Sequence, residues 1–375
     1  MKYYLIAGEK SGDLHGGNLI RALKKRDPHG IFRAWGGDAM QQAGATLVKH
    51  IKETAIMGIG EVIANLKKIL QLINFCKQDI KQFQPDVVIL IDYAGFNLRI
   101  AAFAKKMGCK VFYYISPKVW VWNKRRIRQI KAYVDRMLVI MPFEKEFYAR
   151  EGYPSVDYVG NPVFDAVKNF QPDTNFIALI QRDSRPLIAL LPGSRLQEVK
   201  NILPVMVKSA QFFPNYQFAV AGVAHLPSSL YAPAIQEGIP VYFEKTYDLL
   251  SCAQAALVAS GTATLETALF GVPQVVLYRT GWISALFFWL FIRLPFVSLV
   301  NLSAGREIVK ELLQSDCTAW QVKEELHKLL THKRKYTLQA YNELIKKIAM
   351  PFSASETAAA LILQYAISFT PVSTK

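Results

Sequence analysis

Short apolar runs alternate with helical patterns along the first part of the chain. The runs lie at 3–7, 86–92, 110–115 and 136–141. They are rich in Val, Ile, Leu and Tyr and too short for helices, so they predict buried strands. Between them apolar residues recur three and four positions apart, as at Leu19, Ile20 and Leu23, which predicts helices. Strands that alternate with helices indicate a parallel α/β sheet.

The same pattern starts again after a segment of weak periodicity near 161–173. Its predicted strands lie at 186–191, 217–221, 255–259 and 273–278. The chain is therefore predicted to hold two doubly wound, Rossmann-like α/β domains. We place the first domain at 1–165 and the second at 166–344, and we expect the helical segment 345–375 to pack back on the first.

Length and composition agree with two folded domains and exclude several other classes of protein. A chain of 375 residues has room for two or three domains, and 51% hydrophobic residues exclude a disordered protein. The four cysteines form no CxxC pair, which argues against a disulfide framework and a zinc site. The polar start predicts no signal peptide, and the absence of an uncharged apolar run of about 20 residues predicts no ordinary membrane span.

The net charge of +16 is concentrated in the first part of the chain. Residues 1–150 carry 26 basic and 12 acidic side chains, whereas residues 151–375 carry 19 and 17. The densest basic stretch is 118–136, which also contains Trp120 and Trp122. Such a surface favours nucleic acid, an anionic membrane or a phosphorylated substrate, unless it only keeps the protein soluble. No nucleic-acid-binding motif accompanies it.

Two segments have patterns suited to lipid. Residues 62–83 predict an amphipathic helix with an apolar stripe and lysines beside it, which suits either a membrane interface or a core helix with a solvated face. Residues 282–297 are dense in aromatic side chains, interrupted by Arg293 and Pro295. A buried core helix, a dimer surface and a membrane-dipping surface all fit this second segment.

Loops that follow strands are the candidate ligand sites, because open α/β sheets bind ligands at the carboxyl ends of their strands. Two glycine loops in the second domain each open a helix, where free N–H groups favour an anion. Their residues are Gly193, Ser194, Arg195, Ser260, Gly261 and Thr262. Arg195 adds a guanidinium fork, and Glu266, about one helical turn after the second loop, can accept ribose hydroxyls. Together these residues predict a nucleotide diphosphate.

Asp92 ends the strand at 86–92 in the basic domain. A carboxylate at this edge is a natural general base, although Asp is equally common there as a helix or loop cap. The six histidines have no metal-ligand spacing and the chain contains no D-x-D, so we expect neither a metal nor another cofactor.

Eight segments resemble lipid-A-disaccharide synthases and follow the order of that family. They are AGEKSGDLHG (7–16), MGIGEV (57–62), IDYAGFN (91–97), YYISPKVWVW (113–122), MPFEKEFY (141–148), LLPGSRLQEV (190–199), SGTATLE (260–266) and VSLVNLSAGREIVKELLQ (297–314). Because they span nearly the whole chain, the resemblance does not depend on one motif. The family often has a second Asp where this chain has Gly95.

The resemblance implies a GT-B fold, in which two Rossmann-like domains face each other across a cleft and the C-terminal helices cross back. It implies transfer from UDP-2,3-diacylglucosamine to 2,3-diacylglucosamine 1-phosphate (lipid X), giving the β-1,6-linked lipid A disaccharide 1-phosphate and UDP with inversion and without a metal. The protein would be peripheral on the cytoplasmic face of the inner membrane of a Gram-negative bacterium. An anionic membrane surface is then the expected partner, nucleic acid is not, and a homodimer is compatible with the family.

The resemblance also implies roles for individual residues. Asp92 would remove the proton of the acceptor 6-hydroxyl, Arg195 and the two glycine loops would stabilise the leaving UDP, and Asn301 would lie near the nucleotide. The candidates for contact with the cleft or the acceptor are Glu9, Ser11, Gly12 and Arg306.

Three alternatives stay open at this point. Another UDP-sugar enzyme of GT-B fold, such as a UDP-N-acetylglucosamine 2-epimerase, would explain the second domain but not the basic first one. A nucleic-acid-binding protein would explain the positive charge and would lose binding steeply with salt. A non-catalytic protein of the membrane surface would bind liposomes through the lysines of 62–83.

Overall fold

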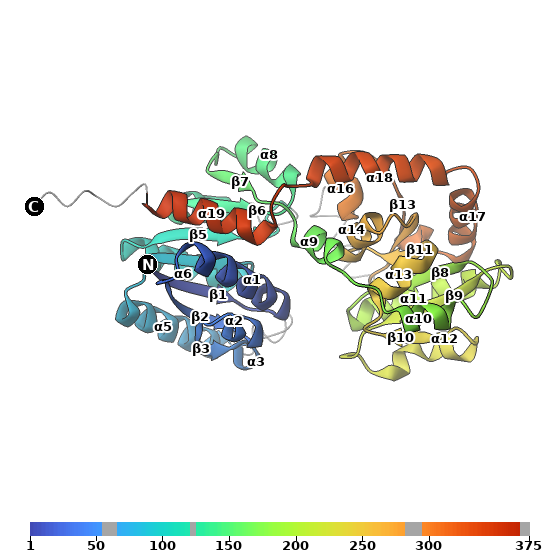
Figure 1. The fold of residues 1–375 in the computed structure, drawn as a ribbon, viewed down its shortest axis with the longest axis horizontal. Helices are drawn as coiled ribbons and strands as arrows, with labels where there is room; N and C mark the ends of the chain where they lie inside the picture. The colour runs from blue at the N-terminus through green and yellow to red at the C-terminus, as the bar shows by residue number, and fades with distance from the viewer. Residues whose placement is uncertain (55–65, 121–124, 282–294, 368–375) are drawn as a thin grey trace, which may run out of the picture. The chain divides into compact units, whose positions relative to one another are not determined.

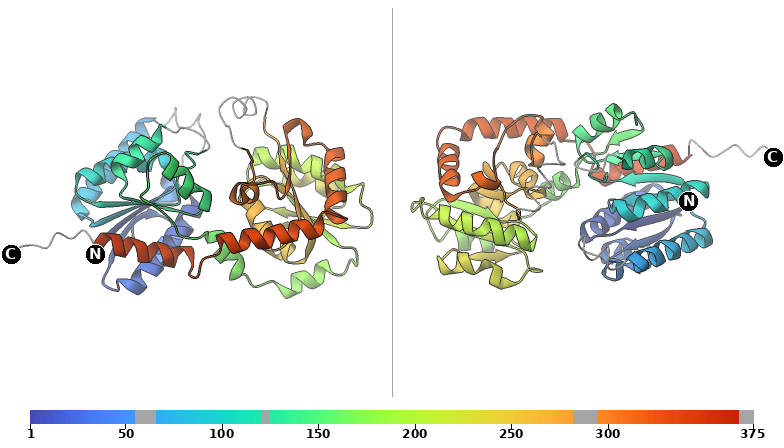
Figure 2. Two further views of the ribbon diagram at one scale, coloured as in Figure 1. Left: turned by 90° about the horizontal axis from the view of Figure 1, so that it is seen from above. Right: turned by 180° about the vertical axis from the view of Figure 1, so that it is seen from behind.

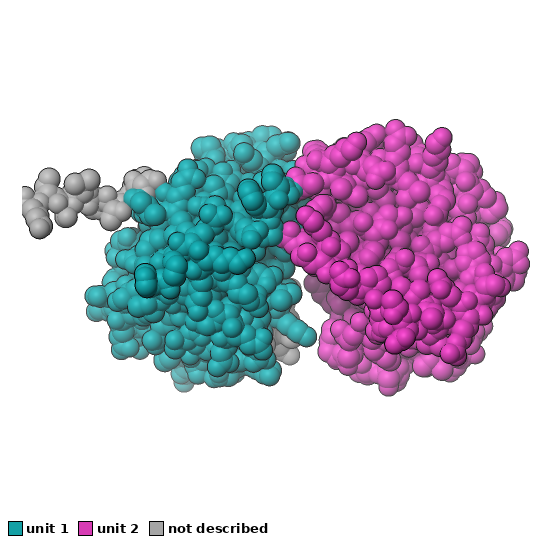
Figure 3. Space-filling view, viewed as in Figure 1, with its two compact units in different colours: residues 1–162, 350–375 teal, residues 163–349 magenta. Residues whose placement is uncertain are grey.

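The architecture comes from a computed structural model, which describes residues 1–54, 66–120, 125–281 and 295–367. The chain forms two compact units, unit 1 from Met1–Pro162 with Met350–Lys375 and unit 2 from Val163–Ala349 (Figures 1 and 3). The changes of unit therefore follow Pro162 and Ala349, where the sequence predicted 165 and 344. The MGIGEV segment at 57–62, Trp122 and most of 282–297 lie outside the described residues.

Within the described residues, unit 1 holds a seven-stranded sheet in the order β3-β2-β1-β4-β5-β6-β7, and its neighbouring strands are parallel. The strands are β1 (Lys2–Ala7), β2 (Ile31–Gly36), β3 (Thr46–His50), β4 (Val87–Ile91), β5 (Lys110–Tyr114), β6 (Arg136–Val139) and β7 (Val156–Tyr158). The central strand β4 reads VVILI and is buried throughout, as expected for a strand covered by helices on both faces.

Helices cover both faces of this sheet. They are α1 (Lys10–Arg26), α2 (Asp38–Gln42), α3 (Ile51–Thr54), α5 (Leu66–Phe83), α6 (Ala94–Lys106), α7 (Arg126–Tyr133), α8 (Pro142–Arg150) and α19 (Ala354–Ile367). One face packs on α1, α2 and α19, the other on α5, α6 and α7. The C-terminal helix α19 thus joins the core of unit 1 through Ala358, Ala359 and Ile362, and Figure 2 shows it along that unit from two further sides.

The amphipathic helix α5 is a core helix on its apolar face. Ile73, Cys76 and Ile80 are buried in the core of unit 1, whereas Leu70 and Phe75 are 49% and 42% exposed. The core alternative therefore describes this part of the helix, and contact with a membrane stays a prediction. No helix in the described ranges combines the length and apolarity that crossing a bilayer requires.

Unit 2 repeats the architecture with a six-stranded parallel sheet, counted over the described residues, in the order β10-β9-β8-β11-β12-β13. Its strands are β8 (Leu187–Leu191), β9 (Gln217–Gly222), β10 (Val241–Phe243), β11 (Ala253–Ala259), β12 (Gln274–Tyr278) and β13 (Lys310–Leu313). Its helices are α9 (Pro162–Lys168), α10 (Thr174–Ile180), α11 (Leu196–Ala210), η1 (Ser228–Tyr231), α12 (Ala232–Gln236), α13 (Thr246–Cys252), α14 (Thr262–Leu269), α16 (Leu299–Ala304), η2 (Gln314–Asp316), α17 (Ala319–Leu330) and α18 (Arg334–Ile348). One face packs on α11 and α17, the other on α10 and α13.

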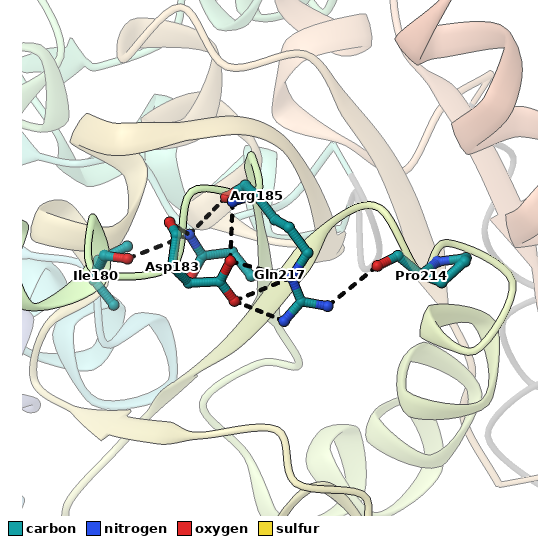
Figure 4. A network of polar contacts seen from close by, with 5 residues as sticks. All are labelled: Ile180, Asp183, Arg185, Pro214 and Gln217. Carbon is teal, nitrogen blue, oxygen red and sulfur yellow. Dashed lines mark hydrogen bonds and ion pairs between the residues drawn. The ribbon is translucent and has the colours of Figure 1, made fainter.

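A polar network closes the amino edge of this second sheet (Figure 4). The Gln217 amide donates to the carbonyl oxygens of Ile180, Asp183 and Arg185 at 3.3, 3.1 and 2.7 Å. Arg185 forms an ion pair with Asp183 and donates to the carbonyl of Pro214 at 3.1 Å. The network therefore ties the end of α10 to β8 and β9, and it leaves the carboxyl edge to the candidate ligand loops.

Candidate functional site

In unit 1, the loops after β1 and β4 meet at one edge of the sheet. Ala7, the last residue of β1, pairs with Ile91, the last residue of β4. The residues that follow, Gly8 and Asp92 with its neighbour Tyr93, are therefore adjacent. The fold thus brings together the first loop and the predicted general base, which are more than 80 positions apart in the sequence.

The backbone of Asp92 and Tyr93 is strained. Their φ angles of +44° and +48° lie in the left-handed region, which costs conformational energy for residues other than glycine. Two side chains hold this turn: Asn97 Nδ2 donates to the Asp92 carbonyl oxygen at 2.8 Å, and the Tyr113 hydroxyl donates to the same oxygen. The surrounding protein thus holds the strained backbone turn from which the Asp92 side chain extends.

Gly8 makes room for this turn. A Cβ at position 8 would lie 2.4, 2.5 and 2.7 Å from three ring carbons of Tyr93. Real Cβ contacts are not that short, so either the ring or the backbone would have to move. The glycine of the first loop is thus explained by the close approach of Tyr93, a requirement that the sequence pattern did not show.

The surroundings of Asp92 favour its protonated form relative to a carboxylate in water. Burial among protein atoms raises the pKa of its carboxyl and the nearby Glu9 carboxylate raises it further, although Lys118 and the Tyr93 N–H lower it. The residue nonetheless reaches solvent, so a substrate hydroxyl can approach it. Glu9 and Ser11 are also exposed.

Glu144 holds the loop that brings Lys118 near Asp92. The Trp120 Nε1–H donates to Glu144 Oε1 at 3.2 Å, and the Met141 N–H donates to Oε2 at 3.1 Å. Glu144 is buried, and this burial raises the pKa of its carboxyl to about 7. In the sequence Glu144 stands out only as part of the MPFEKEFY motif, because nothing in the sequence shows that its carboxylate is enclosed.

Two residues that follow the first loop, in the first turn of α1, have structural roles. Gly12 is buried, and a Cβ there would lie 3.1 Å from that of Ala7, so Gly12 lets α1 pack closely on β1. The structure thus shows a packing role for Gly12, and its contact with a ligand stays a prediction. Asp13 accepts the N–H groups of Gly37, Ala39 and Met40 at 2.6, 3.0 and 3.1 Å, and it thereby caps α2.

In unit 2, the two predicted glycine loops share one cavity. The cavity has a volume of about 180 Å³ at the carboxyl ends of β8, β11 and β12. Its lining includes Arg195, Glu198, Ser260, Tyr278, Arg279 and Thr280. The structure therefore brings Arg195 and Ser260 together, and it adds Arg279 and Thr280 from a loop that the sequence analysis did not consider.

The first glycine loop is already occupied by a carboxylate of the chain itself. Glu198 Oε2 accepts the N–H groups of Ser194 and Arg195 at 3.1 and 3.2 Å, and Glu198 Oε1 accepts from the Arg195 guanidinium at 2.9 Å. Gly193, with φ +108°, leaves the space that this carboxylate fills, since a Cβ there would lie 2.5 Å from Glu198 Oε2. The anion-binding position predicted at the start of α11 is thus filled by Glu198 in this structure.

The second glycine loop has no such internal anion within the described residues. Its cap residue Gly261 has no side chain to accept an N–H, and the first turn of α14 contains no acidic residue. Thr262 is exposed, whereas the Ser260 hydroxyl donates to the Val297 carbonyl at 2.9 Å. Glu266 accepts from the Tyr247 hydroxyl at 2.8 Å, and burial raises the pKa of its carboxyl.

Asn301 supports the second loop from inside the protein. It is fully buried; its Nδ2 donates to the Val309 carbonyl and to Glu311 at 2.9 and 2.8 Å, and its Oδ1 accepts the N–H groups of Ile308 and Val309. Glu311 in turn accepts the N–H of Val297, the residue that Ser260 contacts. Asn301 is therefore placed to position the loop, because hydrogen bonds within the protein already occupy its amide.

Arg306 lies at the opposite edge of the second sheet. It precedes β13, and its guanidinium donates to the Tyr336 hydroxyl at 2.7 Å and to Glu343 at 2.8 Å, both on α18. The structure thus pairs Arg306 with a carboxylate of its own unit. Contact of Arg306 with the acceptor stays a prediction; within unit 2 its guanidinium is held by these two partners on α18.

Comparisons with known proteins find relatives over nearly the whole chain. The family model for lipid-A-disaccharide synthetase matches residues 3–363. A lipid-A-disaccharide synthase from Syntrophus aciditrophicus (strain SB) is 38% identical over 370 residues, with 96% of each chain covered. Another, from Myxococcus xanthus (strain DK1622), is 39% identical over 337 residues, with 87% of each covered.

Solved structures share the fold at low sequence identity. UDP-GlcNAc 2-epimerase from Neisseria meningitidis, bound to UDP-GlcNAc, matches with a TM-score of 0.64 at 15% identity, covering 98% of this chain and 100% of that one. The glycotransferase of kitacinnamycin matches with a TM-score of 0.65 at 13% identity, covering 97% and 98%. The α/β fold of GT-B type is therefore confirmed, and at these identities the likeness shows the fold alone.

Proposed function

This chain belongs to the lipid-A-disaccharide synthase family of glycosyltransferases, and we propose on that premise which substrates it uses and how its residues act. The donor is UDP-2,3-diacylglucosamine and the acceptor is 2,3-diacylglucosamine 1-phosphate. The reaction joins the 6-hydroxyl of the acceptor to the anomeric carbon of the donor. Its products are the β-1,6-linked disaccharide 1-phosphate and UDP.

Asp92 is the proposed general base. As the acceptor O6 attacks the anomeric carbon, its O–H bond breaks, the proton passes to an Asp92 carboxylate oxygen, and the bond from the anomeric carbon to the UDP oxygen breaks. A single displacement of this kind inverts the anomeric configuration. The supporting observation is a solvent-reaching carboxylate with a raised pKa on a backbone turn that Asn97 and Tyr113 hold, since a base works best when its pKa approaches the working pH.

Unit 2 is proposed to contain the binding site for UDP. Arg195, Ser260, Gly261 and Thr262 lie at the carboxyl edge where open α/β sheets bind ligands, and the 180 Å³ cavity joins Arg195 to Ser260. Positive charge there stabilises the negative charge that develops on the leaving UDP. In other enzymes a metal ion can supply this stabilisation. Glu266 is the proposed ribose ligand, and Tyr247 orients its carboxylate.

Unit 1 is proposed to contain the binding site for the acceptor. Its positive charge suits a phosphorylated sugar at an anionic membrane, and Lys118 lies near Asp92, where the acceptor hydroxyl must bind. We place the protein at the cytoplasmic face of the inner membrane of a Gram-negative bacterium, attached to the surface by the basic unit. Glu9 and Ser11 are the proposed acceptor contacts of the first loop, and a homodimer is compatible with this role.

The test supplies purified protein with both glycolipids and follows UDP release together with disaccharide formation by mass spectrometry. Asp92→Asn is expected to lower kcat by roughly 10²–10⁴-fold, the usual contribution of a general base. UDP binding by calorimetry should stay unchanged, because the nucleotide is assigned to unit 2. Asp38→Asn is the matched control, an exposed aspartate that the mechanism does not use. Near-normal turnover of Asp92→Asn would refute the assignment.

A further inference from the structure

Arg279 places a positive charge at the edge of the nucleotide cavity. It follows β12, is exposed, and lines both the 180 Å³ cavity with Arg195 and Ser260 and a neighbouring cavity of about 470 Å³. Among the residues that the structure describes, its guanidinium forms neither a hydrogen bond nor an ion pair. The roles proposed so far for the other residues of the cavity do not explain a charge at this position.

Arg195, the other arginine of the cavity, differs in this respect. Its guanidinium is 2.9 Å from Glu198 Oε1, and Glu198 Oε2 takes the N–H groups at the start of α11. Glu198 therefore already takes up part of the charge and of the N–H groups of that loop. Of the two described arginines that line the cavity, Arg279 is thus the one whose guanidinium has no carboxylate partner among the described residues.

The backbone beside Arg279 is fixed from the next strand. The N–H of Thr280 donates to Gln314 Oε1 at 3.3 Å, and Gln314 Nε2 donates to the Thr280 hydroxyl at 3.0 Å. The loops after β12 and β13 are thus tied together, which holds the base of the Arg279 side chain while its guanidinium stays open to the cavity. Because the backbone is already ordered here, only the side chain of Arg279 has to lose conformational entropy when it binds an anion.

We propose that Arg279 binds the diphosphate of the nucleotide in this cavity and neutralises the charge of the leaving group. The planar guanidinium can contact two phosphate oxygens at once, which suits a diphosphate better than a single point charge does. The inference rests on the proposed function, because it assumes that unit 2 holds a nucleoside diphosphate. It adds a third loop, the one after β12, to the two that the sequence analysis assigned to this ligand.

The experiment measures binding of UDP and of uridine to the full-length protein by calorimetry. Arg279→Gln is expected to weaken UDP about 10- to 100-fold and to leave uridine unchanged, since the lost contact is a charge-assisted one to phosphate. Arg279→Lys should retain part of the affinity. Arg182→Gln is the matched control, an exposed arginine between α10 and β8 at the opposite edge of the sheet, and it should bind UDP as the unaltered protein does.

Two results would overturn the inference. Unchanged UDP affinity in Arg279→Gln would show that the guanidinium makes no phosphate contact, and an equal loss for UDP and uridine would show a structural effect. If the unaltered protein bound no UDP, the proposed function would fail first. That result differs from one in which the unaltered protein and Arg279→Gln bind UDP equally well, which would overturn only the role of Arg279.

Discussion

Replacing Gly8 with alanine tests whether the turn at Asp92 needs the space that this glycine leaves. The new Cβ would overlap three ring carbons of Tyr93, the nearest at 2.4 Å, where an ordinary contact is about 3.4 Å or longer. The ring or the Gly8 backbone must therefore shift by about 1 Å. Tyr93 cannot yield easily, because its ring stacks on Phe96 at 5.4 Å and its carbonyl accepts the Asn97 N–H.

The expected effects follow from this overlap. Overpacking of this kind costs about 1–3 kcal/mol of stability. A shift of about 1 Å passed to the neighbouring Asp92, the proposed general base, should lower turnover on the order of 10²-fold, because proton transfer depends on the position of the base. UDP affinity should stay unchanged, because the nucleotide is assigned to unit 2.

The assay compares the urea unfolding and the kcat of Gly8→Ala with those of Gly95→Ala. Gly95 is the second residue of α6, and a Cβ there meets nothing within 4 Å. Gly95→Ala should therefore be neutral or stabilise the helix by up to about 1 kcal/mol. If Gly8→Ala matched Gly95→Ala in both measurements, the argument that Gly8 sets the position of Asp92 would be wrong.

Two further predictions concern buried carboxylates. Burial raises the pKa of Glu144 in the folded chain to about 7. Between pH 4.5 and about 7 the unfolded chain therefore releases a proton that the folded chain keeps. The free energy of unfolding should accordingly fall by up to about 3 kcal/mol as the pH rises through this range. Urea unfolding of Glu144→Gln should lack this component, and a difference from the unaltered protein that does not vary with pH would contradict it. Asp13→Asn places an amide donor against N–H groups at the start of α2 and should cost about 1–3 kcal/mol, measured by urea unfolding, with Asp38→Asn as the neutral control.

The fold class could be predicted because buried parallel strands are almost wholly apolar. The β4 strand, VVILI, and β8, LIALL, are recognisable without any knowledge of their neighbours. The strands β2 and β3 were not predicted, because Arg33 and Lys49 interrupt their apolar pattern. Their pairing with β1 and with each other decides that they are strands, and pairing is not visible in a local pattern.

Helix α5 shows the limit of periodicity. The sequence indicates an apolar stripe, but a core helix and a membrane-surface helix have the same stripe. Packing against the first sheet buries Ile73, Cys76 and Ile80, whereas Leu70 on the same predicted stripe stays exposed. The orientation of the helix about its axis decides which residues are buried, and contacts with the sheet set that orientation.

The sequence by itself determined the α/β class, the family and the loops in which chemistry should lie, because apolar periodicity and ordered motifs are properties of the chain read in order. Only the tertiary structure decided which polar groups of those loops already have partners. Glu198 fills the first glycine loop, Asn301 is enclosed by hydrogen bonds, and Arg279 is left with its charge open to the cavity. A hydrogen bond needs two groups at about 3 Å, and for groups far apart in sequence that distance exists only after the strands have aligned.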